Sequence, residues 1–179
     1  MRRASSGDAA AFGELLTRHR SSALRVATVM LGTASGADDV VQDADVRAWR
    51  AHATIDPARG FRSWYLHVVA NAGKNARRSR GRRAALELRA PHEGSVPDPA
   101  DRAVTHIERV AVIAAVNRLD ADDRLVIALR HFEQLTEHEM SEVLACPVGT
   151  VKSRLSRATA RLRAQLVRLQ KEELDDRSR

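Results

Sequence analysis

The apolar residues of this chain recur at the spacing of an α-helix, and no stretch of the sequence shows the sustained period-two alternation of a β-strand. Over the first 31 residues the apolar positions lie three, four or seven residues apart, at Phe12, Leu16, Ala23, Ala27 and Met30. This spacing predicts a helix over 8–31, with Asp8 as its N-cap. Because Ala, Leu, Arg and Glu dominate the rest of the chain as well, we expect an all-α protein.

The same pattern predicts two more helices in the N-terminal half. Ser35 is positioned to cap a second helix that runs to about His52. An Asp-Pro pair and a glycine predict a loop over 53–60, and a third long helix follows over 61–83. Helices with one apolar side bury that side against each other, so we expect a small helical bundle here.

A proline-rich stretch interrupts the helical pattern near the middle of the chain. Three of the five prolines fall within nine residues, at Pro91, Pro97 and Pro99, and they favour extended backbone. Helical patterns resume over 104–118 and 122–132. We therefore expect a first domain, a flexible linker, a second domain and a charged tail, at 1–85, 86–105, 106–171 and 172–179.

A helix-turn-helix pattern occupies the second domain. Thr136 and Glu139 form a capping box that begins one helix, and a tight turn over 146–149 ends it. Thr150 is expected to cap the long helix that follows. Apolar residues form a single stripe along this long helix, at Val151, Leu155, Ala158, Leu162, Leu166 and Leu169. The second helix of such a pair fits the major groove of DNA.

The distribution of charge supports a polyanionic partner. The net charge is +7, and two acid-free segments, 74–83 and 150–171, hold six and seven basic residues. The rest of the chain therefore carries a net charge of −6. Ser153 and Arg157 face away from the apolar stripe of the long helix, so its outward side is polar and basic. Basic segments on helices are typical of nucleic-acid binding, and the total charge alone is a weaker signal.

Composition excludes several classes of protein. A single cysteine excludes a disulfide framework and a cysteine-rich zinc module. The sequence has no histidine pair at metal-ligand spacing, no phosphate-binding glycine loop and no nucleophile motif, so we expect no enzyme activity, no metal and no cofactor. The longest apolar run, 110–116, is seven residues long, whereas a membrane helix needs about 20. We expect a cytoplasmic protein without membrane insertion.

Three segments resemble one protein family, in the same order and at similar spacing. PVGTVKSRLSRATARLR resembles the recognition-helix segment of extracytoplasmic-function (ECF) sigma factors, a subgroup of the bacterial sigma-70 family. DDVVQDADVRAW resembles their polymerase-binding helix, and FRSWYLHVVANAGKNARRSRGRR resembles their promoter-melting helix. The resemblance spans roughly residues 6–170. It implies a sigma region 2 helical bundle in the first domain and a sigma region 4 helix-turn-helix in the second.

The resemblance also implies partners and contact residues. Core RNA polymerase, promoter DNA and an anti-sigma factor are the expected partners. The residues expected to bind polymerase are Asp39, Gln42, Asp43, Val46 and Trp49. Those expected to hold the minus-ten element and help to melt it, together with loop 53–60, are Phe61, Trp64, Tyr65, Asn71, Lys74, Asn75, Arg77 and Arg78. Those expected at the minus-35 element are Thr150, Lys152, Ser153, Arg154, Ser156, Arg157 and Arg161.

Some positions depart from the family pattern or leave alternatives open. The family commonly has an aromatic residue at Asp45 and glycine at Gln134 and Ala145, and Ala145 is expected to be tolerated unless its backbone needs a positive φ. Aromatic residues at helical spacing are more often core than stacking platforms, so Trp64 or Phe61 is expected to serve mostly in packing. An autonomous helix-turn-helix repressor is the alternative function, but it leaves the first domain without a role.

Overall fold

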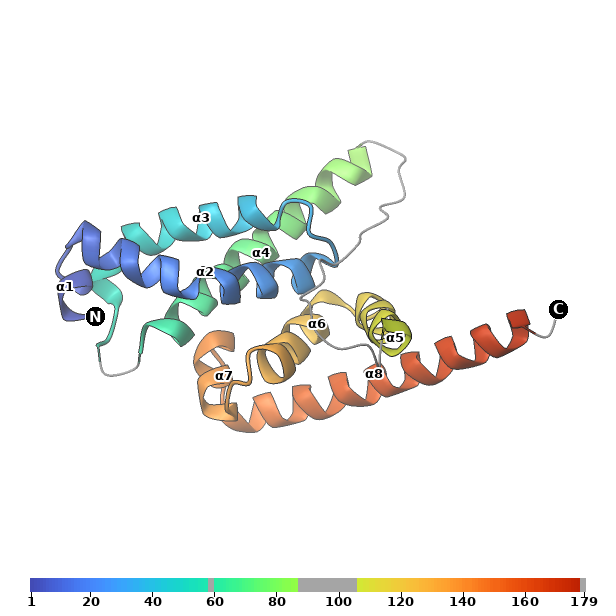
Figure 1. The fold of residues 1–179 in the computed structure, drawn as a ribbon. Helices are drawn as coiled ribbons and strands as arrows, with labels where there is room; N and C mark the ends of the chain where they lie inside the picture. The colour runs from blue at the N-terminus through green and yellow to red at the C-terminus, as the bar shows by residue number, and fades with distance from the viewer. Residues whose placement is uncertain (58–59, 87–105, 178–179) are drawn as a thin grey trace.

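The computed structural model describes residues 1–57, 60–86 and 106–177, and every regular element in these ranges is helical. The α-helices are α1 (Arg2–Ser5), α2 (Ala9–Leu31), α3 (Ala37–Arg50), α4 (Phe61–Leu86), α5 (His106–Asn117), α6 (Ala121–Ile127), α7 (Glu137–Leu144) and α8 (Val148–Arg177). A 3-10 turn follows α3 at His52–Thr54, and a π-helical turn follows α6 at Ala128–Phe132. Figure 1 shows α1–α4, here the N-terminal unit, on one side of α5–α8, the C-terminal unit. The all-α prediction is confirmed.

The N-terminal unit is a bundle of three long helices. Phe12, Val41 and Tyr65, from α2, α3 and α4, are almost fully buried in its centre. Asp8 caps α2 as predicted, because its Oδ1 accepts a hydrogen bond from the Ala11 backbone N–H at 2.9 Å. The predicted cap at Ser35 is wrong, since α3 begins after Gly36, which has a φ of 78° and no side chain to cap with.

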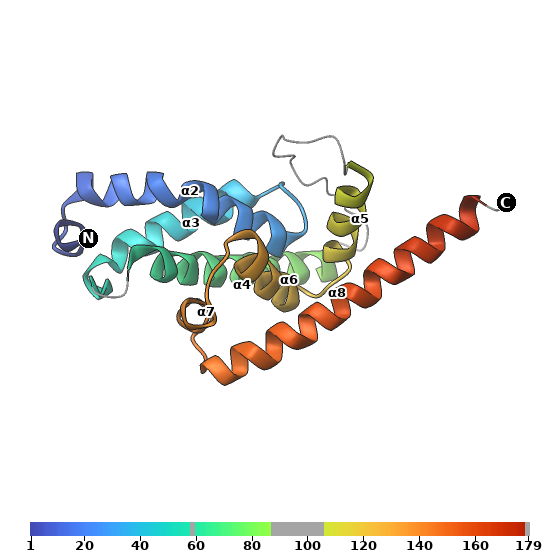
Figure 2. The same ribbon diagram turned by 60° about the horizontal axis from the view of Figure 1, so that its bottom comes forward.

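The C-terminal unit packs α5, α6 and α7 onto the long helix α8. The capping box at the start of α7 is confirmed, because Thr136 and Glu139 exchange hydrogen bonds between their side chains and backbones. The predicted cap at Thr150 is wrong, since α8 already begins at Val148 and Thr150 lies in its first turn. Beyond α5 and α6, the C-terminal part of α8 extends away from the rest of the molecule (Figures 1 and 2).

The structure allows the predicted tail, but not the predicted linker, to be compared with an observed element. Most of the predicted linker, 87–105, lies outside the described residues. The predicted charged tail begins inside α8, which continues to Arg177. Val167 and Leu174 lie on the outward side of this part of α8, opposite the apolar stripe, and they are 52% and 64% exposed.

The turn between α7 and α8 carries backbone strain. Ala145 ends α7 with a φ of 49°, in the left-handed region that favours glycine, and Gln134 has a φ of 53° before α7. These are the two positions at which the ECF family commonly has glycine. Alanine at position 145 was expected to be tolerated unless the backbone there needs a positive φ. The structure shows that the backbone does have a positive φ at Ala145, so some strain is expected there.

Substitution of Ala145 by glycine is expected to stabilise the protein. A residue with a Cβ loses about 1–2 kcal/mol in the left-handed region. Glycine removes that strain but costs about 0.5–1 kcal/mol through its freedom in the unfolded chain. The net gain of about 0.5–1 kcal/mol corresponds to a rise in Tm of about 1–4 °C, measurable by circular dichroism. Ala164→Gly, the same exchange on the exposed side of α8, should lower Tm instead. A fall in Tm for Ala145→Gly contradicts the strain argument.

The two units pack directly against each other. Figures 1 and 2 show α7 beside α4, and α6 beside the C-terminal end of α2. Arg124 on α6 donates a hydrogen bond to the carbonyl of Met30 at 2.8 Å, across the contact between the units. Buried apolar residues of both units belong to one continuous cluster. This arrangement places the face of α4 that the sequence assigned to DNA next to the C-terminal unit.

Candidate polymerase and promoter interfaces

The helix α3 presents one exposed stripe of mixed acidic and apolar side chains. All five residues assigned to polymerase binding are exposed on it: Asp39, Gln42, Asp43, Val46 and Trp49. Val46 is 50% exposed and Trp49 is 38% exposed, so the stripe offers apolar surface beside its carboxylates. The inner edge of the Trp49 ring packs edge-on against Phe12, at 5.2 Å between centroids, and its face stacks on His52 at 5.0 Å. An anchored, half-exposed tryptophan beside carboxylates is typical of a protein-contact surface.

The side chain at the unusual position, Asp45, turns inward from this stripe. Its Oδ1 accepts a hydrogen bond from the Tyr65 hydroxyl at 2.5 Å, and Arg20 lies 3.7 Å from its Oδ2. Burial of the ring, followed by the Asp45 carboxylate, raises the pKa of Tyr65 and keeps the phenol protonated. Asp45 therefore links α3 to α4 inside the N-terminal unit and does not belong to the exposed stripe.

The aromatic residues of α4 lie mainly in the core. Phe61 is 3% exposed and Tyr65 is fully buried, and the two rings stack at 5.4 Å between centroids. Neither ring is therefore available to stack on a base in this structure, although the sequence predicts both Phe61 and Tyr65 among the residues that hold the minus-ten element. The expectation of a packing role fits Phe61. Trp64 is the member of the set that reaches the surface, where it lines a cavity.

The polar residues of α4 follow the aromatic ones toward its C-terminal end. Asn71, Asn75, Arg77 and Arg78 are exposed, and Lys74 is half-buried. They make a polar and basic face that suits the phosphates and base edges of a nucleic acid. Asn71 is also engaged by a neighbour, because its Nδ2 donates to His67 Nε2 at 2.9 Å.

The first turns of α8 form the exposed second helix of the helix-turn-helix. The side chains assigned to the minus-35 element lie on these turns: Thr150, Lys152, Ser153, Arg154, Ser156, Arg157 and Arg161. Thr150 is half-buried, and all the others are exposed. Val151 and Ala158 on the opposite side are fully buried against α6 and α7. The helix is thus anchored by its apolar side and offers hydroxyls and guanidinium groups outward, which are the groups that read base edges and phosphates.

Within this set, Arg157 and Arg161 differ in what holds them. The Arg157 Nε donates to the carbonyl of Ser153 at 3.2 Å, one turn back on the same helix, and its guanidinium is otherwise presented to solvent. Arg161 instead pairs with Asp123 at 2.5 Å and with Asp120 at 3.5 Å on α6. Arg161 therefore ties α8 to α6, and a phosphate has to compete with two carboxylates for it.

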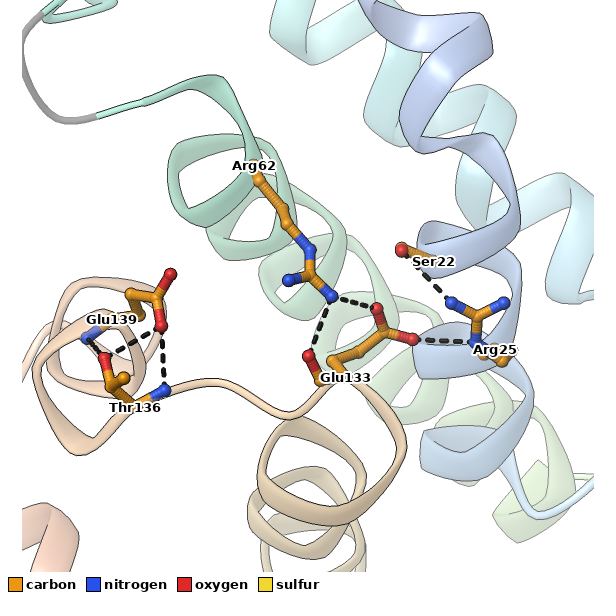
Figure 3. A network of polar contacts seen from close by, with 6 residues as sticks. All are labelled: Ser22, Arg25, Arg62, Glu133, Thr136 and Glu139. Carbon is orange, nitrogen blue, oxygen red and sulfur yellow. Dashed lines mark hydrogen bonds and ion pairs between the residues drawn. The ribbon is translucent and has the colours of Figure 1, made fainter.

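The structure also brings together a polar cluster that sequence patterns did not indicate (Figure 3). The fully buried carboxylate of Glu133, in the C-terminal unit, pairs with Arg25 of α2 at 2.8 Å and with Arg62 of α4 at 2.7 Å. Burial opposes the ionisation of Glu133, but hydrogen bonds from Arg25, Ser22 and Arg62 outweigh it and hold its pKa below the usual value. These partners lie 108 and 71 residues away from Glu133 in the sequence, so no local motif signals the cluster.

The described part of the chain contains no group of three or more histidine, cysteine, aspartate or glutamate side chains arranged to hold a metal ion. In the same part, no helix is both long and apolar enough to cross a membrane.

A helical bundle with a protein-contact stripe, joined to a helix-turn-helix with a basic outward face, defines a DNA-binding protein that also docks on a protein. Two family models match the chain accordingly: Sigma-70 region 2 over residues 15–83 and Sigma-70, region 4 over residues 109–162. The chain belongs to the sigma-70 family of RNA polymerase sigma factors, and within it to the ECF group. The resemblance seen in the sequence is thereby confirmed, and nothing supports the alternative of an autonomous repressor.

Similar proteins cover almost the whole chain. The RNA polymerase sigma factor NccH of Alcaligenes xylosoxydans xylosoxydans is 32% identical over 170 residues, which make up 92% of this chain and 91% of NccH. The ECF RNA polymerase sigma-E factor of Escherichia coli (strain K12) is 31% identical over 171 residues, covering 87% and 86% of the two chains. Among solved structures, the sigma factor RpoE of Bartonella quintana, in complex with the anti-sigma factor NepR, has a TM-score of 0.74 and 25% identity, covering 87% and 96%.

Proposed function

We propose that this protein directs core RNA polymerase to promoters with two elements, using a separate surface for each contact. The exposed α3 stripe docks on the polymerase, the polar face of α4 engages the minus-ten region, and the first turns of α8 read the minus-35 duplex. The protein contributes binding and strand separation, without covalent chemistry of its own, and it works in the cytoplasm, where polymerase and promoter DNA meet.

The observation that carries this proposal is the pairing of two unlike exposed surfaces on one chain. The α3 stripe combines Val46 and Trp49 with carboxylates, which repel DNA but suit a protein partner. The outward side of α8 carries Lys152, Arg154 and Arg157, which attract DNA. A protein that binds DNA alone has no use for the first surface.

The minus-ten contact is proposed for a smaller set than the sequence predicts. With Phe61 and Tyr65 buried, Trp64 is the aromatic side chain available to stack on an unpaired base. Asn71 and Asn75 supply hydrogen-bonding groups, and Arg77 and Arg78 supply charge for the backbone. Similarity to the Bartonella quintana factor, solved with the anti-sigma factor NepR, supports an anti-sigma partner for this chain as well.

Run-off transcription with purified core polymerase tests the proposal. Core enzyme alone should give no specific transcript, and core enzyme with this protein should initiate at discrete promoters from a fragment library of the source genome. Adding the protein without core enzyme provides a control for direct binding. The sigma-factor assignment is contradicted, and a repressor is favoured, if two results occur together. These are that core enzyme with this protein initiates at no promoter, and that the protein alone protects a palindromic site. The salt concentration should be close to physiological, because phosphate contacts weaken with salt.

A further inference from the structure

The Trp49 side chain is held by a residue that follows α3. The imidazole of His52, in the 3-10 turn, stacks on the Trp49 ring at 5.0 Å between centroids, with 21° between the ring planes. The His52 Nδ1 lies 2.8 Å from the backbone carbonyl oxygen of Trp49. Because a carbonyl oxygen can only accept, this Nδ1 carries the hydrogen and donates it. The hydrogen bond therefore fixes the imidazole in the position from which it stacks on the indole.

Phe12 of α2 makes the second contact with the same indole. Its ring meets Trp49 edge-on at 5.2 Å between centroids, with 70° between the ring planes. Phe12 is almost fully buried in the core, whereas His52 is half-buried at the surface. The indole is thus confined from the inside by Phe12 and from the chain beyond α3 by His52, and only the second of these contacts can be removed without damage to the core.

The first residues of the chain lie against His52. Figure 1 shows α1 beside the turn that follows α3, and the two elements are in contact. A Cβ added to Gly7 would lie 3.4 Å from the His52 Nε2, so the Gly7 backbone runs close to this edge of the imidazole. Gly7 has a φ of 91°, in the left-handed region that favours glycine. Position 7 therefore needs glycine for its backbone and has little room for a side chain beside His52.

Residues 1–7, here the N-terminal segment, are anchored to the bundle by packing and by charge. Ala4 has no exposed surface and belongs to the apolar core. Arg3 pairs with Asp8, the cap of α2, at 2.7 Å, and its backbone carbonyl accepts from the Asp8 N–H at 3.0 Å. The N-terminal segment is thus folded back onto the start of α2, where it lies next to His52.

We propose that His52 is a positioning residue for polymerase docking, and that the N-terminal segment contributes to affinity by holding His52 against Trp49. A ring that is already fixed avoids the loss of conformational freedom that a mobile side chain undergoes on binding. His52 and Gly7 act through Trp49 and do not themselves contact polymerase. This inference rests on the proposed function for the identity of the partner, whereas the hold on Trp49 exists without a partner.

Time-resolved fluorescence anisotropy measures the hold on Trp49 in the free protein. A Trp64→Phe background leaves Trp49 as the only tryptophan of the full chain. In this background the ring should move with the whole protein, and His52→Ala should add a fast decay on the nanosecond scale. His52→Phe retains a ring to stack on and should show a smaller fast component than His52→Ala. A ring that is mobile before the substitution, or equally restricted after His52→Ala, overturns the positioning role whatever the partner of α3 is.

Binding of core polymerase tests whether this hold matters for docking. His52→Ala should raise Kd about 3- to 10-fold, which corresponds to the freezing of one side chain. In a Trp49→Ala background the same substitution should have no further effect, because His52 acts through Trp49. Thr17→Ala removes another exposed hydrogen bond from a side chain to a carbonyl, on α2, and should leave Kd unchanged.

The outcomes of this cycle separate the inference from the proposed function. Equal losses from His52→Ala in both backgrounds mean that His52 contacts polymerase itself or supports the fold in general, and no loss in either means that its stacking is irrelevant to docking. Both results overturn the proposal. An unchanged Kd for Trp49→Ala contradicts the proposed role of α3, and the anisotropy measurement then still decides whether His52 holds the ring.

Gly7→Ala tests the contribution of the N-terminal segment. A Cβ at this position is strained by the positive φ and approaches His52, so the segment has to shift away from the imidazole. Kd should rise in the same direction as for His52→Ala, and only when Trp49 is present. Gly13→Ala is the matched control, because Gly13 lies within α2 and no neighbouring segment comes within 4 Å of a Cβ there. If both alanine variants bind core polymerase equally well, the N-terminal segment has no part in docking.

Discussion

Trp49→Ala is expected to weaken the binding of core polymerase by about 2 kcal/mol, or about 30-fold in Kd. Trp49 is 38% exposed on α3, and its ring is held by an edge-on contact with Phe12 and by stacking on His52. A preorganised aromatic ring loses little conformational freedom on docking, so most of the area it buries contributes to affinity. Fluorescence anisotropy with labelled protein and unlabelled core enzyme measures the change.

Two companion variants separate docking from stability. Trp49→Phe retains an aromatic ring over Phe12 and should recover part of the affinity. Glu14→Ala alters an exposed side chain on α2, outside the stripe, and should leave Kd unchanged within the error. Equal Kd values for Trp49→Ala and the parent protein, with both chains folded by circular dichroism, remove α3 from the polymerase interface.

Arg157→Ala should lower promoter-specific binding by the polymerase holoenzyme by about 1–3 kcal/mol, or about 5- to 150-fold, with no change in the affinity for core enzyme. The side chain is exposed on the first turns of α8, and among the described residues no carboxylate pairs with its guanidinium. Bidentate contact of arginine with guanine is the commonest specific contact in the major groove. Competition between promoter and random duplex DNA at fixed salt reports the loss.

Arg168→Ala is the matched control for this substitution. Arg168 lies three turns further along α8 and pairs with Glu172 on the solvent-exposed part of the helix. Removing it takes away the same charge but no predicted base contact. If both variants lose promoter binding equally, the effect is one of overall charge, and Arg157 does not read sequence.

Local patterns in the sequence predicted the helices well, because caps and apolar spacing are properties of neighbouring residues. Asp8 and the Thr136–Glu139 pair mark real helix starts. Errors occurred where tertiary structure decides. Ser35 has the right chemistry for a cap, but the chain turns through the left-handed Gly36 instead.

For the candidate sites too, features decided by neighbouring residues could be predicted, and features decided by tertiary structure could not. Residues on α3 and α8 were placed on exposed faces correctly, since their helices each have one apolar side and one polar side. On α4, spacing could not decide which aromatic residue faces out, because Phe61 and Tyr65 share one side of the helix and Trp64 lies between its two sides. The cluster around Glu133 depends on two residues from another part of the chain, which no spacing rule connects.

The inward hydrogen bond of Asp45 has a consequence for the orientation of α3. Rotation of α3 about its own axis would pull Asp45 away from the Tyr65 hydroxyl and leave a buried phenol without its acceptor. Val46 follows Asp45 directly, and Trp49 lies one turn later, so the same rotation would change the direction in which both side chains face. A polar contact in the interior thus determines the angle at which the outer surface of α3 meets any partner.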